Sequence, residues 1–355
     1  MLPVTSMATL GAEWRALEAE VPGLSFFQSW SWVGCLASER YSQPVLIRAL
    51  EGQLVVGLAL FNRRGGRLFL TESGDPVLDA PFIEHNAPLC VGGAPALAAM
   101  LRRAAPATGG LMLNGVPSAV LATAPGVAFR LQRRSAPFVD LAALAVMGGD
   151  HLATLSANTR QQIRRSGRHF AAQGAVRLER AENLDDARGM LAEMIILHGA
   201  SWRARGRPGA FAHPFMLRFH EALLTEALPR GEIDLLRLRA GAVTIGILYN
   251  FRLGGRISAY QSGFVPGGGH ARPGLSCHVA AIAHGLARGD RIYDFLGGAD
   301  RYKLSLARDT APLFWAQMMP RWSWRGIAAR LRDHVASVRS NRRGNNASGA
   351  GGGPD

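Results

Sequence analysis

The sequence has 355 residues and a formal net charge of +14, and 48% of the residues are apolar. This length favours two modest domains or one large one, with enough apolar residues for a sizeable core. The charge favours anionic partners such as phosphates, nucleic acid or acidic lipid, and does not choose among them. No apolar run approaches the roughly 20 residues that span a bilayer, so we expect no transmembrane segment.

The cysteines indicate the compartment. Cys35, Cys90 and Cys277 are odd in number and widely spaced. This pattern argues against a disulfide framework and against a paired thiolate zinc site. The first residues also lack the charged and apolar regions of a secretory signal. We therefore expect a cytoplasmic protein that holds no metal.

In chain order, the first clearly patterned segment is residues 46–74, and residues 235–263 repeat it without gaps. About a third of the aligned positions are identical, and the shared residues include the glycines at which tight turns are expected. These glycines are Gly52 with Gly241, Gly65 with Gly254, and Gly66 with Gly255. The sequence therefore predicts two copies of one module.

Each copy is predicted to hold three short strands broken at the glycine turns. Two helices precede the strands, and a helix and a further strand follow them. The helices are expected at 9–21, 30–41 and 94–105 in the first copy and at 187–202, 211–228 and 274–289 in the second, with the further strands at 110–116 and 291–297. The same order twice predicts a tandem α+β fold, each module a mixed, mostly antiparallel sheet flanked by helices.

We expect an N-terminal domain at 1–140, a basic helical connection at 141–180 and a C-terminal domain at 181–325. In the connection, Asn158 followed by Gln161 resembles a capping box that opens a helix. Residues 326–355 are expected to form a basic helix and a disordered tail from Asn341. Tryptophans precede this helix, which either packs on the protein or seeks an anionic membrane surface.

A glycine-rich loop separates the last strand of the second triplet from the helix that begins near Leu275. Such a loop offers backbone N–H groups and a positive helix end to a phosphate. His270 and Arg272 lie beside the expected helix start and can add contacts to a pyrophosphate. A glycine-rich loop is more often only a loop, and no Gly-Lys-Ser or Gly-Lys-Thr follows it here.

The stretch from Met194 to Lys303 resembles the acetyltransferase domain of the CelD type, also called BioF2-like, a branch of the GNAT superfamily. The matching motifs are LHGASWRARGRPGAF around His198, RPGLS at the helix start and YDFLGGADRYK from Tyr293. The last motif also resembles the Fem peptidyltransferases, which share a doubled GNAT-like architecture and take an aminoacyl-tRNA donor. The long heptad insertion of several Fem enzymes is missing from this sequence.

The resemblance implies tandem GNAT-like domains, with acetyl-CoA or another acyl-CoA as co-substrate in the second copy. The first copy, which lacks both the RPG and YDFLGGADRYK motifs, would be a degenerate partner that shapes the acceptor cleft. The donor would bind in the glycine-rich region of the second copy. The residues implied there are Gln261, Gly263, His270, Arg272, Gly274, Leu275 and Ser276.

Lys303 is the only lysine of the chain. An ammonium approaches one oxygen more closely than a planar guanidinium does, so Lys303 suits an oxyanion or a substrate phosphate, unless it is an ordinary surface lysine. Asp294 ends a buried strand, where it either takes part in catalysis or fixes the loop. His198 is a candidate base or a packed residue. Tyr302 and Tyr260 are candidates to protonate the departing thiolate, or core residues.

Trp202, Arg203, Phe211 and Tyr260 are expected to line the acceptor side, although SWRARGRPG also fits a solvated basic loop. The favoured hypothesis is transfer of an acyl group from acyl-CoA to a small amine, such as an amino sugar, in polysaccharide or envelope biosynthesis. A second hypothesis keeps the fold and takes aminoacyl-tRNA as the donor, the only nucleic acid we expect as a partner. A third is a non-catalytic basic scaffold or peripheral-membrane protein.

Overall fold

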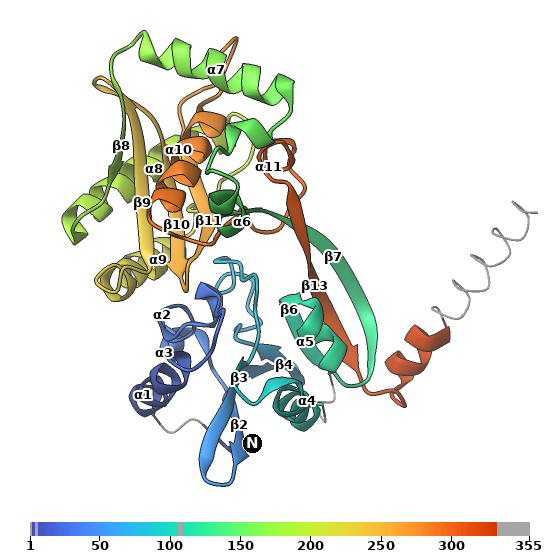
Figure 1. Cartoon of the computed structure of the whole chain (residues 1–355). Helices are drawn as coiled ribbons and strands as arrows, with labels where there is room; N and C mark the ends of the chain where they lie inside the picture. Colours follow the sequence, from blue (N-terminus) through green and yellow to red (C-terminus); the bar gives the residue numbers. More distant parts are fainter. Residues whose placement is uncertain (1, 4–5, 106–108, 332–355) are drawn as a thin grey trace, which may run out of the picture.

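The computed structural model describes residues 2–3, 6–105 and 109–331, and their strands form one 13-stranded sheet. The strands follow the order β1-β2-β3-β4-β6-β13-β7-β12-β11-β10-β9-β8, and β5 pairs with β3. Two neighbouring pairs are parallel, β4 with β6 and β11 with β12, and the other described pairs are antiparallel. The α+β class with a mixed, mostly antiparallel sheet is confirmed (Figure 1).

The first half of the chain builds one end of this sheet. Its three expected strands are present, and helices precede and follow them as predicted. In order, the elements are β1 Leu2–Pro3, α1 Met7–Glu18, α2 Trp30–Val33, α3 Ala37–Arg40, β2 Pro44–Glu51, β3 Leu54–Arg64, β4 Arg67–Leu70, β5 Leu89–Cys90, α4 Gly93–Ala104, β6 Leu111–Pro117, α5 Ser118–Thr123 and β7 Val127–Asp140.

The second half repeats this order after two additional helices and one additional strand. Its elements are α6 Leu141–Val146, α7 Ala157–Ala171, β8 Val176–Arg180, α8 Leu184–Arg203, α9 Pro214–Ala227, β9 Ile233–Ala240, β10 Val243–Leu253, β11 Arg256–Phe264, α10 Pro273–Ala287, β12 Ile292–Asp294, α11 Arg301–Leu306 and β13 Asp309–Met319. The stretch expected to be a helical connection thus also contains β8, which pairs with β9.

The turn glycines explain why the two copies fold alike. Gly52 and Gly241 have φ of 62° and 56°, and each closes a hairpin between the first two strands of its triplet. This left-handed backbone disfavours residues that carry a Cβ atom. In both copies the third strand then pairs in parallel with the strand that follows the helix. The predicted duplication is therefore present in the fold.

The last strand of each half crosses to the sheet of the other half. β7 ends the first half and pairs with β12 of the second, whereas β13 ends the second half and pairs with β6 of the first. The two crossing strands also pair with each other along most of their length, as Figure 1 shows in green and orange-red. This exchange joins the halves into one continuous sheet.

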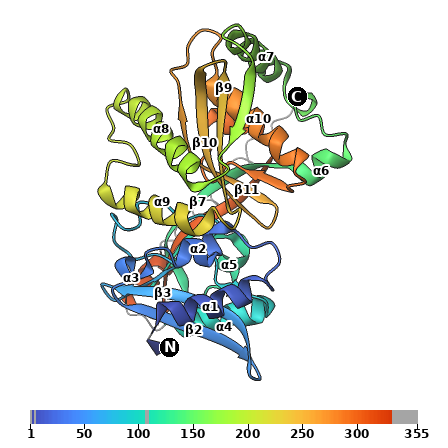
Figure 2. The same cartoon turned by 90° about the vertical axis from the view of Figure 1, so that its left-hand side faces the viewer.

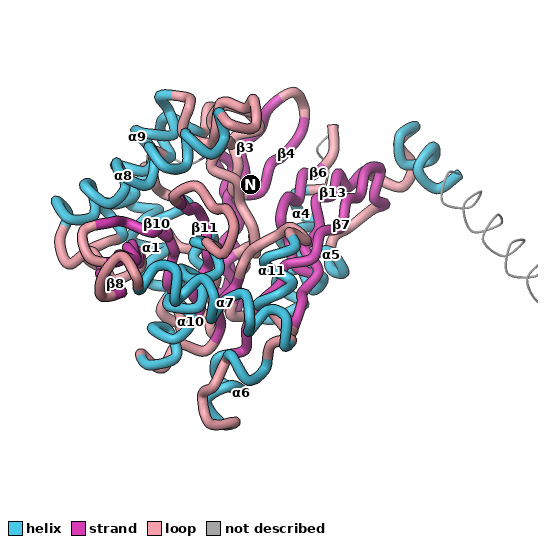
Figure 3. Tube along the Cα trace, turned by 90° about the horizontal axis from the view of Figure 1, so that it is seen from above, coloured by secondary structure: helices cyan, strands magenta, loops and turns pink. Residues whose placement is uncertain are grey.

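Helices cover both faces of the second half's strands. Seen from above in Figure 3, α8 and α9 lie on one side of β10 and β11, and α10 lies on the other. The strand residues alternate accordingly, since Leu235 and Ile247 pack in the core with α8 and α9, and Leu236 and Leu248 pack with α10. Figure 2 shows α9 between this sheet and α2 of the first half.

Two local expectations were wrong. The helix α7 is capped by Ser156, whose hydroxyl accepts the Thr159 N–H, and not by Asn158. The helix expected at 30–41 is broken into α2 and α3 at Leu36, which takes the left-handed φ of 50°. After β13 the chain forms a short helix at 324–331, and the rest of the predicted basic helix and the predicted disordered tail lie outside the described residues.

Candidate functional site

A cavity of about 630 Å³ opens in the second half, where β11 and β12 separate. The two strands pair only from Arg256 to Ser258 with Ile292 to Asp294. Beyond this point β11 continues to Phe264 while the other chain segment turns toward α11. The walls are Phe82 of the first half, His198, Ser201, Trp202 and Arg205 on and after α8, Ala259, Tyr260, Gln261, Ser262 and Phe264 of β11, His278 of α10, and Asp300, Arg301, Tyr302 and Lys303 at α11.

Lys303 lies buried in the wall of this cavity. Its Nζ donates to the carbonyl oxygens of Gly297 at 2.9 Å and Leu296 at 3.4 Å, which leaves one of the three ammonium protons for a ligand. Burial lowers the pKa of Lys303, and the carboxylates of Glu84 and Asp300 act against this shift. The Lys303 ammonium is therefore held by the backbone of its own loop rather than by a close ion pair.

Asp294 is not among the residues of the cavity wall, and both of its carboxylate oxygens have protein partners. Oδ2 lies 2.5 Å from Nη1 of Arg256 and 2.9 Å from Nε2 of His85, and Oδ1 accepts the Leu296 N–H at 2.7 Å. Burial alone would raise the pKa of Asp294, but the charges of His85 and Arg256 and these hydrogen bonds hold it below its ordinary value. This geometry fixes the loop that leads to Lys303.

The first half contributes side chains that the sequence did not single out. The ring of Phe82 lies 4.8 Å from that of Tyr260 in the cavity wall. Glu84 is buried and accepts the Gly297 N–H, and burial raises its pKa. Phe82, Glu84 and His85 belong to a loop without strand or helix periodicity. The one sequence signal for a site here is that an acidic residue, a histidine and an aromatic residue lie close together in the chain.

His198 lines the cavity with both ring nitrogens engaged. Nε2 accepts the Ala210 N–H at 3.3 Å, so Nδ1 carries the proton and donates to the Ser262 carbonyl oxygen at 2.9 Å. Burial lowers the pKa of His198, which keeps the imidazole neutral. The Trp202 ring lies beside it, tilted by 31° with ring centroids 5.6 Å apart, and also lines the cavity.

The other residues expected near the acceptor differ in whether they line the cavity. Tyr260 lines the cavity, and its hydroxyl is buried without a partner among the described residues. Phe211 packs edge-on against His198 in the core behind the wall, with ring centroids 5.6 Å apart, and Arg203 is exposed at the end of α8. Tyr302 lines the cavity and stacks on His278 at 5.4 Å.

Of the expected donor residues, Gln261 lines the cavity itself. Gly263 lies under α8, where an added Cβ would come within 2.4 Å of the Met194 carbonyl oxygen. The others follow along the loop and the first turn of α10 outside the cavity wall: His270 and Arg272 are exposed, Gly274 and Ser276 half-buried, and Leu275 buried.

The start of α10 is contacted by the basic helix α7. Ser166 of α7 accepts the Arg272 N–H at 3.0 Å, and its hydroxyl shares a hydrogen bond of 2.8 Å with Ser276. The two serines and the Arg272 backbone therefore form one hydrogen-bonded group at the end of the glycine-rich loop. One face of the expected phosphate site is thus closed by α7.

In the first half, the corresponding opening between β4 and β6 is filled by polar side chains. Asn86 is fully buried and donates to the carbonyl oxygens of Leu70 at 3.0 Å and Asn114 at 3.1 Å. Asn114 donates to Glu72 at 2.6 Å, and Glu72 occupies the position that Gln261 has in the second copy. Protein side chains thus take the space that the cavity occupies in the second half.

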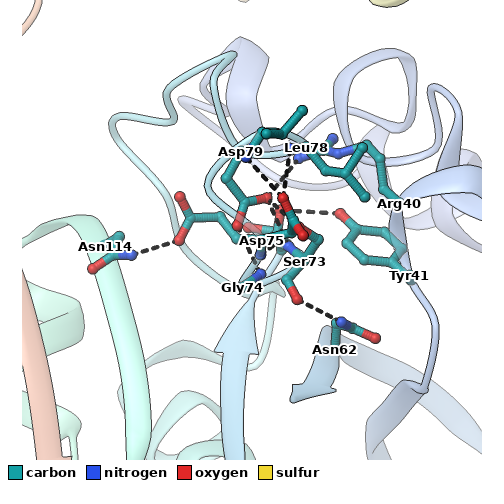
Figure 4. Close-up of polar contacts among 12 residues, drawn as sticks. Arg40, Tyr41, Asn62, Ser73, Gly74, Asp75, Leu78, Asp79 and Asn114 are labelled. Atoms are coloured by element: carbon teal, nitrogen blue, oxygen red, sulfur yellow. Dashed lines mark hydrogen bonds and ion pairs between the residues drawn. The ribbon is translucent and has the colours of Figure 1, made fainter. Parts of the chain in front are cut away.

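Asp79 anchors the loop that follows β4, as Figure 4 shows. The Asp79 carboxylate accepts the backbone N–H groups of Ser73 and Gly74 and lies 3.7 Å from Nη2 of the buried Arg40. Burial, and then the charge of Asp79, raise the pKa of Glu72 to about 8.

The described part of the chain holds no group of three or more His, Cys, Asp or Glu side chains suited to a metal ion. Among the described residues, no helix is both long and apolar enough to cross a membrane.

The second half has a GNAT-like fold, and part of it is similar to a known family. Residues 157–304 match the family described as the Acetyltransferase (GNAT) domain, and this range contains every described element from α7 through the start of α11. A comparison with curated proteins finds no match.

Solved structures share the architecture of nearly the whole chain. FemX is 10% identical, with a TM-score of 0.59, over 90% of this chain and 98% of that chain. The C-terminal domain of a putative lysylphosphatidylglycerol synthetase from Agrobacterium fabrum is 11% identical, with a TM-score of 0.57, over 93% and 96%. The L-PGS of Bacillus licheniformis is 13% identical, with a TM-score of 0.54, over 90% and 96%. At these identities the likeness concerns the fold alone.

Proposed function

We propose that this protein transfers an acyl group from acyl-CoA to the amine of a small acceptor. The observation that carries the proposal is the cavity in which Lys303, Tyr302, Tyr260, Gln261 and His198 meet, within the stretch that matches the acetyltransferase family. Domains of this family use acyl-CoA, which supplies a reactive thioester. The cavity offers hydrogen-bond donors without partners, which suits the oxygen atoms of such a ligand.

In the proposed reaction the acceptor nitrogen attacks the thioester carbon, a C–N bond forms and the C–S bond breaks. The amine loses one proton, and the CoA thiolate gains one. Lys303 stabilises the negative charge that develops on the carbonyl oxygen, since its remaining N–H is directed by two backbone carbonyl groups. Tyr302 is the proposed proton donor to the thiolate, and the proton that the amine releases to solvent is balanced by the one that Tyr302 takes back from solvent.

Two of the residues considered for catalysis serve structure instead in this proposal. Asp294 is engaged by Arg256, His85 and a backbone N–H, so it positions the loop that holds Lys303. His198 accepts a backbone N–H through Nε2, so it shapes the acceptor side and does not take the amine proton.

The acceptor side lies between α8 and α11. Trp202 offers an apolar ring there, and Arg205 and Arg301 add two positive charges against the single carboxylate of Asp300. This balance supports an amine acceptor that also carries a negative charge. We propose that the acceptor is an amino sugar or a related amine, and that the reaction belongs to polysaccharide or envelope biosynthesis of the CelD-like, BioF2-like type. The reaction would take place in the cytoplasm.

The first test is thermal unfolding with and without acetyl-CoA, on the wild type and on Lys303→Ala. A ligand at a hundred times its dissociation constant stabilises the native state by about 2.7 kcal/mol. We expect stabilisation of the wild type and a smaller effect in the variant. If acetyl-CoA stabilises neither protein, the acyl-CoA proposal is wrong.

The second candidate donor is an aminoacyl-tRNA. Its support is the fold likeness to FemX and the row of exposed arginines on α7, which are Arg164, Arg165 and Arg168. Binding of tRNA through such a surface should weaken steeply with salt, because phosphate contacts release counterions. Filter binding of tRNA across a salt series tests this, and affinity that does not change with salt would exclude it.

The third candidate is a peripheral-membrane scaffold. Trp322 and Trp324 are 81% and 72% exposed, and Arg325 and Arg330 lie over their rings. Aromatic residues with arginines favour an anionic lipid surface. Flotation with vesicles that contain phosphatidylglycerol, before and after deletion from Arg321, tests this contact, and equal flotation of both chains would refute it.

A further inference from the structure

His278 lines the cavity with one ring nitrogen occupied and the other without a partner. The residue is 2% exposed and lies in the second turn of α10. Its Nδ1 is 2.8 Å from the hydroxyl oxygen of Tyr293 on β12. Its Nε2 is buried and has no hydrogen-bond partner among the described residues. Unpaired buried polar atoms are rare in native structures, so this nitrogen calls for an explanation.

The contact with Tyr293 determines which ring nitrogen carries the proton. Tyr293 is fully buried, and His278 is the hydrogen-bond partner that the structure gives its hydroxyl. If Nδ1 carried the proton, it would donate to the hydroxyl oxygen and leave the hydroxyl proton unpaired. If the hydroxyl donates to Nδ1 instead, the proton of the neutral imidazole stands on Nε2. The second arrangement satisfies every group of the pair and leaves a single N–H available.

Burial makes this arrangement persistent. The buried environment, and to a lesser degree the positive charge of Lys303, lower the pKa of His278 to about 3. The burial of Tyr293 raises the pKa of its hydroxyl well above the ordinary value, so it stays a donor. The imidazole is therefore neutral near pH 7, with Nδ1 as its acceptor and Nε2–H as its donor.

Lys303, in the same cavity wall, is a donor as well. Lys303 has one ammonium proton left after its two bonds to backbone carbonyl groups. The Tyr302 ring stacks on His278 and blocks one face of the imidazole, without accepting from Nε2. The wall that His278 and Lys303 share is thus complementary to an acceptor atom, such as the oxygen of a carbonyl group.

We propose that His278 donates a hydrogen bond from Nε2 to the carbonyl oxygen of the bound acyl thioester, next to Lys303, and that Tyr293 is the positioning residue that fixes the tautomer. This inference rests on the proposed acyl-CoA function. No proton is transferred in this contact. As the amine attacks, electron density moves onto the oxygen and the bond from His278 strengthens; it weakens again when the C–S bond breaks and the thiolate leaves.

The test compares acetyl-CoA with free CoA, which lacks the carbonyl group. In His278→Ala, we expect the dissociation constant of acetyl-CoA to rise roughly five- to tenfold, the effect of one hydrogen bond, and that of free CoA to stay unchanged. Isotope-edited infrared spectra of acetyl-CoA labelled with ¹³C at the carbonyl group should show a lower C=O frequency on the wild type than on the variant.

Two further variants separate positioning from structure. Tyr293→Phe keeps the ring and removes the hydroxyl, so ¹⁵N NMR should find His278 only as the Nε2–H tautomer in the wild type and as a mixture in the variant. His284→Ala, on the same helix and outside the cavity wall, is the matched control and should keep both affinities. His278→Phe keeps a ring and removes both ring nitrogens, so it replaces the alanine variant if that variant does not fold.

The outcomes are distinct. If the wild type binds neither acetyl-CoA nor CoA, the acyl-CoA function fails and this inference falls with it. If the wild type binds both and the His278 variants leave the ratio of the two affinities and the infrared band unchanged, this inference alone is wrong. An Nδ1–H tautomer in the wild type would also overturn it.

Discussion

Nε2 of His85 lies 2.9 Å from Oδ2 of Asp294, so a loop of the first half holds the strand end from which the loop to Lys303 starts. Asp294 is also paired with Arg256, and Leu296, two residues later, takes the left-handed φ of 61° and offers its carbonyl group to Lys303. The conformation of the Lys303 loop therefore depends on both halves of the chain.

Asp294→Asn should lower the free energy of unfolding and have a smaller effect on turnover. The amide cannot balance Arg256, and breaking a buried ion pair costs about 3 kcal/mol or more. Because the pKa of Asp294 is held below its ordinary value of 3.8, the wild type has this stabilisation above that pH and loses it as the pH falls through the folded-state pKa. Urea unfolding at pH 7 and at decreasing pH should find the variant less stable at pH 7 and less sensitive to acid.

The control for this variant is Asp300→Asn, because the Asp300 side chain is 66% exposed and lies 4.0 Å from Lys303. We expect it to change stability by less than about 0.5 kcal/mol. Equal losses in the two variants would show that the buried pair does not set stability.

Lys303→Arg should fold normally and lose most turnover. The Lys303 ammonium fits beside two carbonyl oxygens in a buried position, and the wider guanidinium fork cannot keep these bonds and reach the same ligand oxygen. We expect kcat to fall roughly a hundredfold or more, the effect of removing one oxyanion donor, with little change in thermal unfolding. Release of free CoA thiol from acetyl-CoA with a panel of amino sugars measures this.

Arg308→Lys provides the matched control, since Arg308 lies just after α11 and outside the cavity wall. It should leave turnover unchanged. Because burial lowers the pKa of Lys303, wild-type turnover should also decline as the pH rises through that lowered value, when the ammonium loses its charge. Turnover of Lys303→Arg within a factor of two of the wild type would remove the proposed role.

The sequence predicted the parts of this fold that local patterns determine. Turn glycines such as Gly52 and Gly241 must take positive φ, so they revealed both hairpins and the duplication. The single lysine and Gln261 were recognised through composition and a family motif, and both line the cavity. The exchange of β7 and β13 depends on pairing between distant strands, which no local pattern records.

His278 shows why other site residues could not be found from sequence. It stands beside Cys277 on a largely apolar helix, and that pattern is typical of a core residue. Its Nε2 becomes a candidate donor only because Tyr293 occupies Nδ1 and because β11 and β12 separate to open the cavity. Phe82 belongs to the first half and reaches the cavity through tertiary packing alone.

Asn86→Ala should destabilise the protein and also weaken ligand binding. The Asn86 amide donates to the carbonyl oxygens of Leu70 and Asn114 and accepts from the Thr71 hydroxyl. Removing it would take this partner from each of the three groups. The loss should be about 2–3 kcal/mol. Because Asn86 follows His85 directly, we expect a raised dissociation constant for acetyl-CoA as well. Chemical unfolding and calorimetric titration measure the two effects. A loss of stability with unchanged affinity would show that Asn86 stabilises the first half and does not affect ligand binding.

Glu72→Gln should stabilise the protein at alkaline pH. The pKa of Glu72 is raised from 4.5 to about 8, first by burial and then by Asp79, so folding favours the protonated form. The wild type therefore has its full stability below pH 4.5 and loses part of it as the pH rises through 8. The neutral amide can still accept the Asn114 N–H and has no such loss. We expect the variant to exceed the wild type by about 1 kcal/mol or more at pH 9, the equivalent of one pKa unit, and to match it at pH 4. Chemical unfolding across this range decides the matter, because a difference that does not change with pH would show that Glu72 does not titrate in the folded protein.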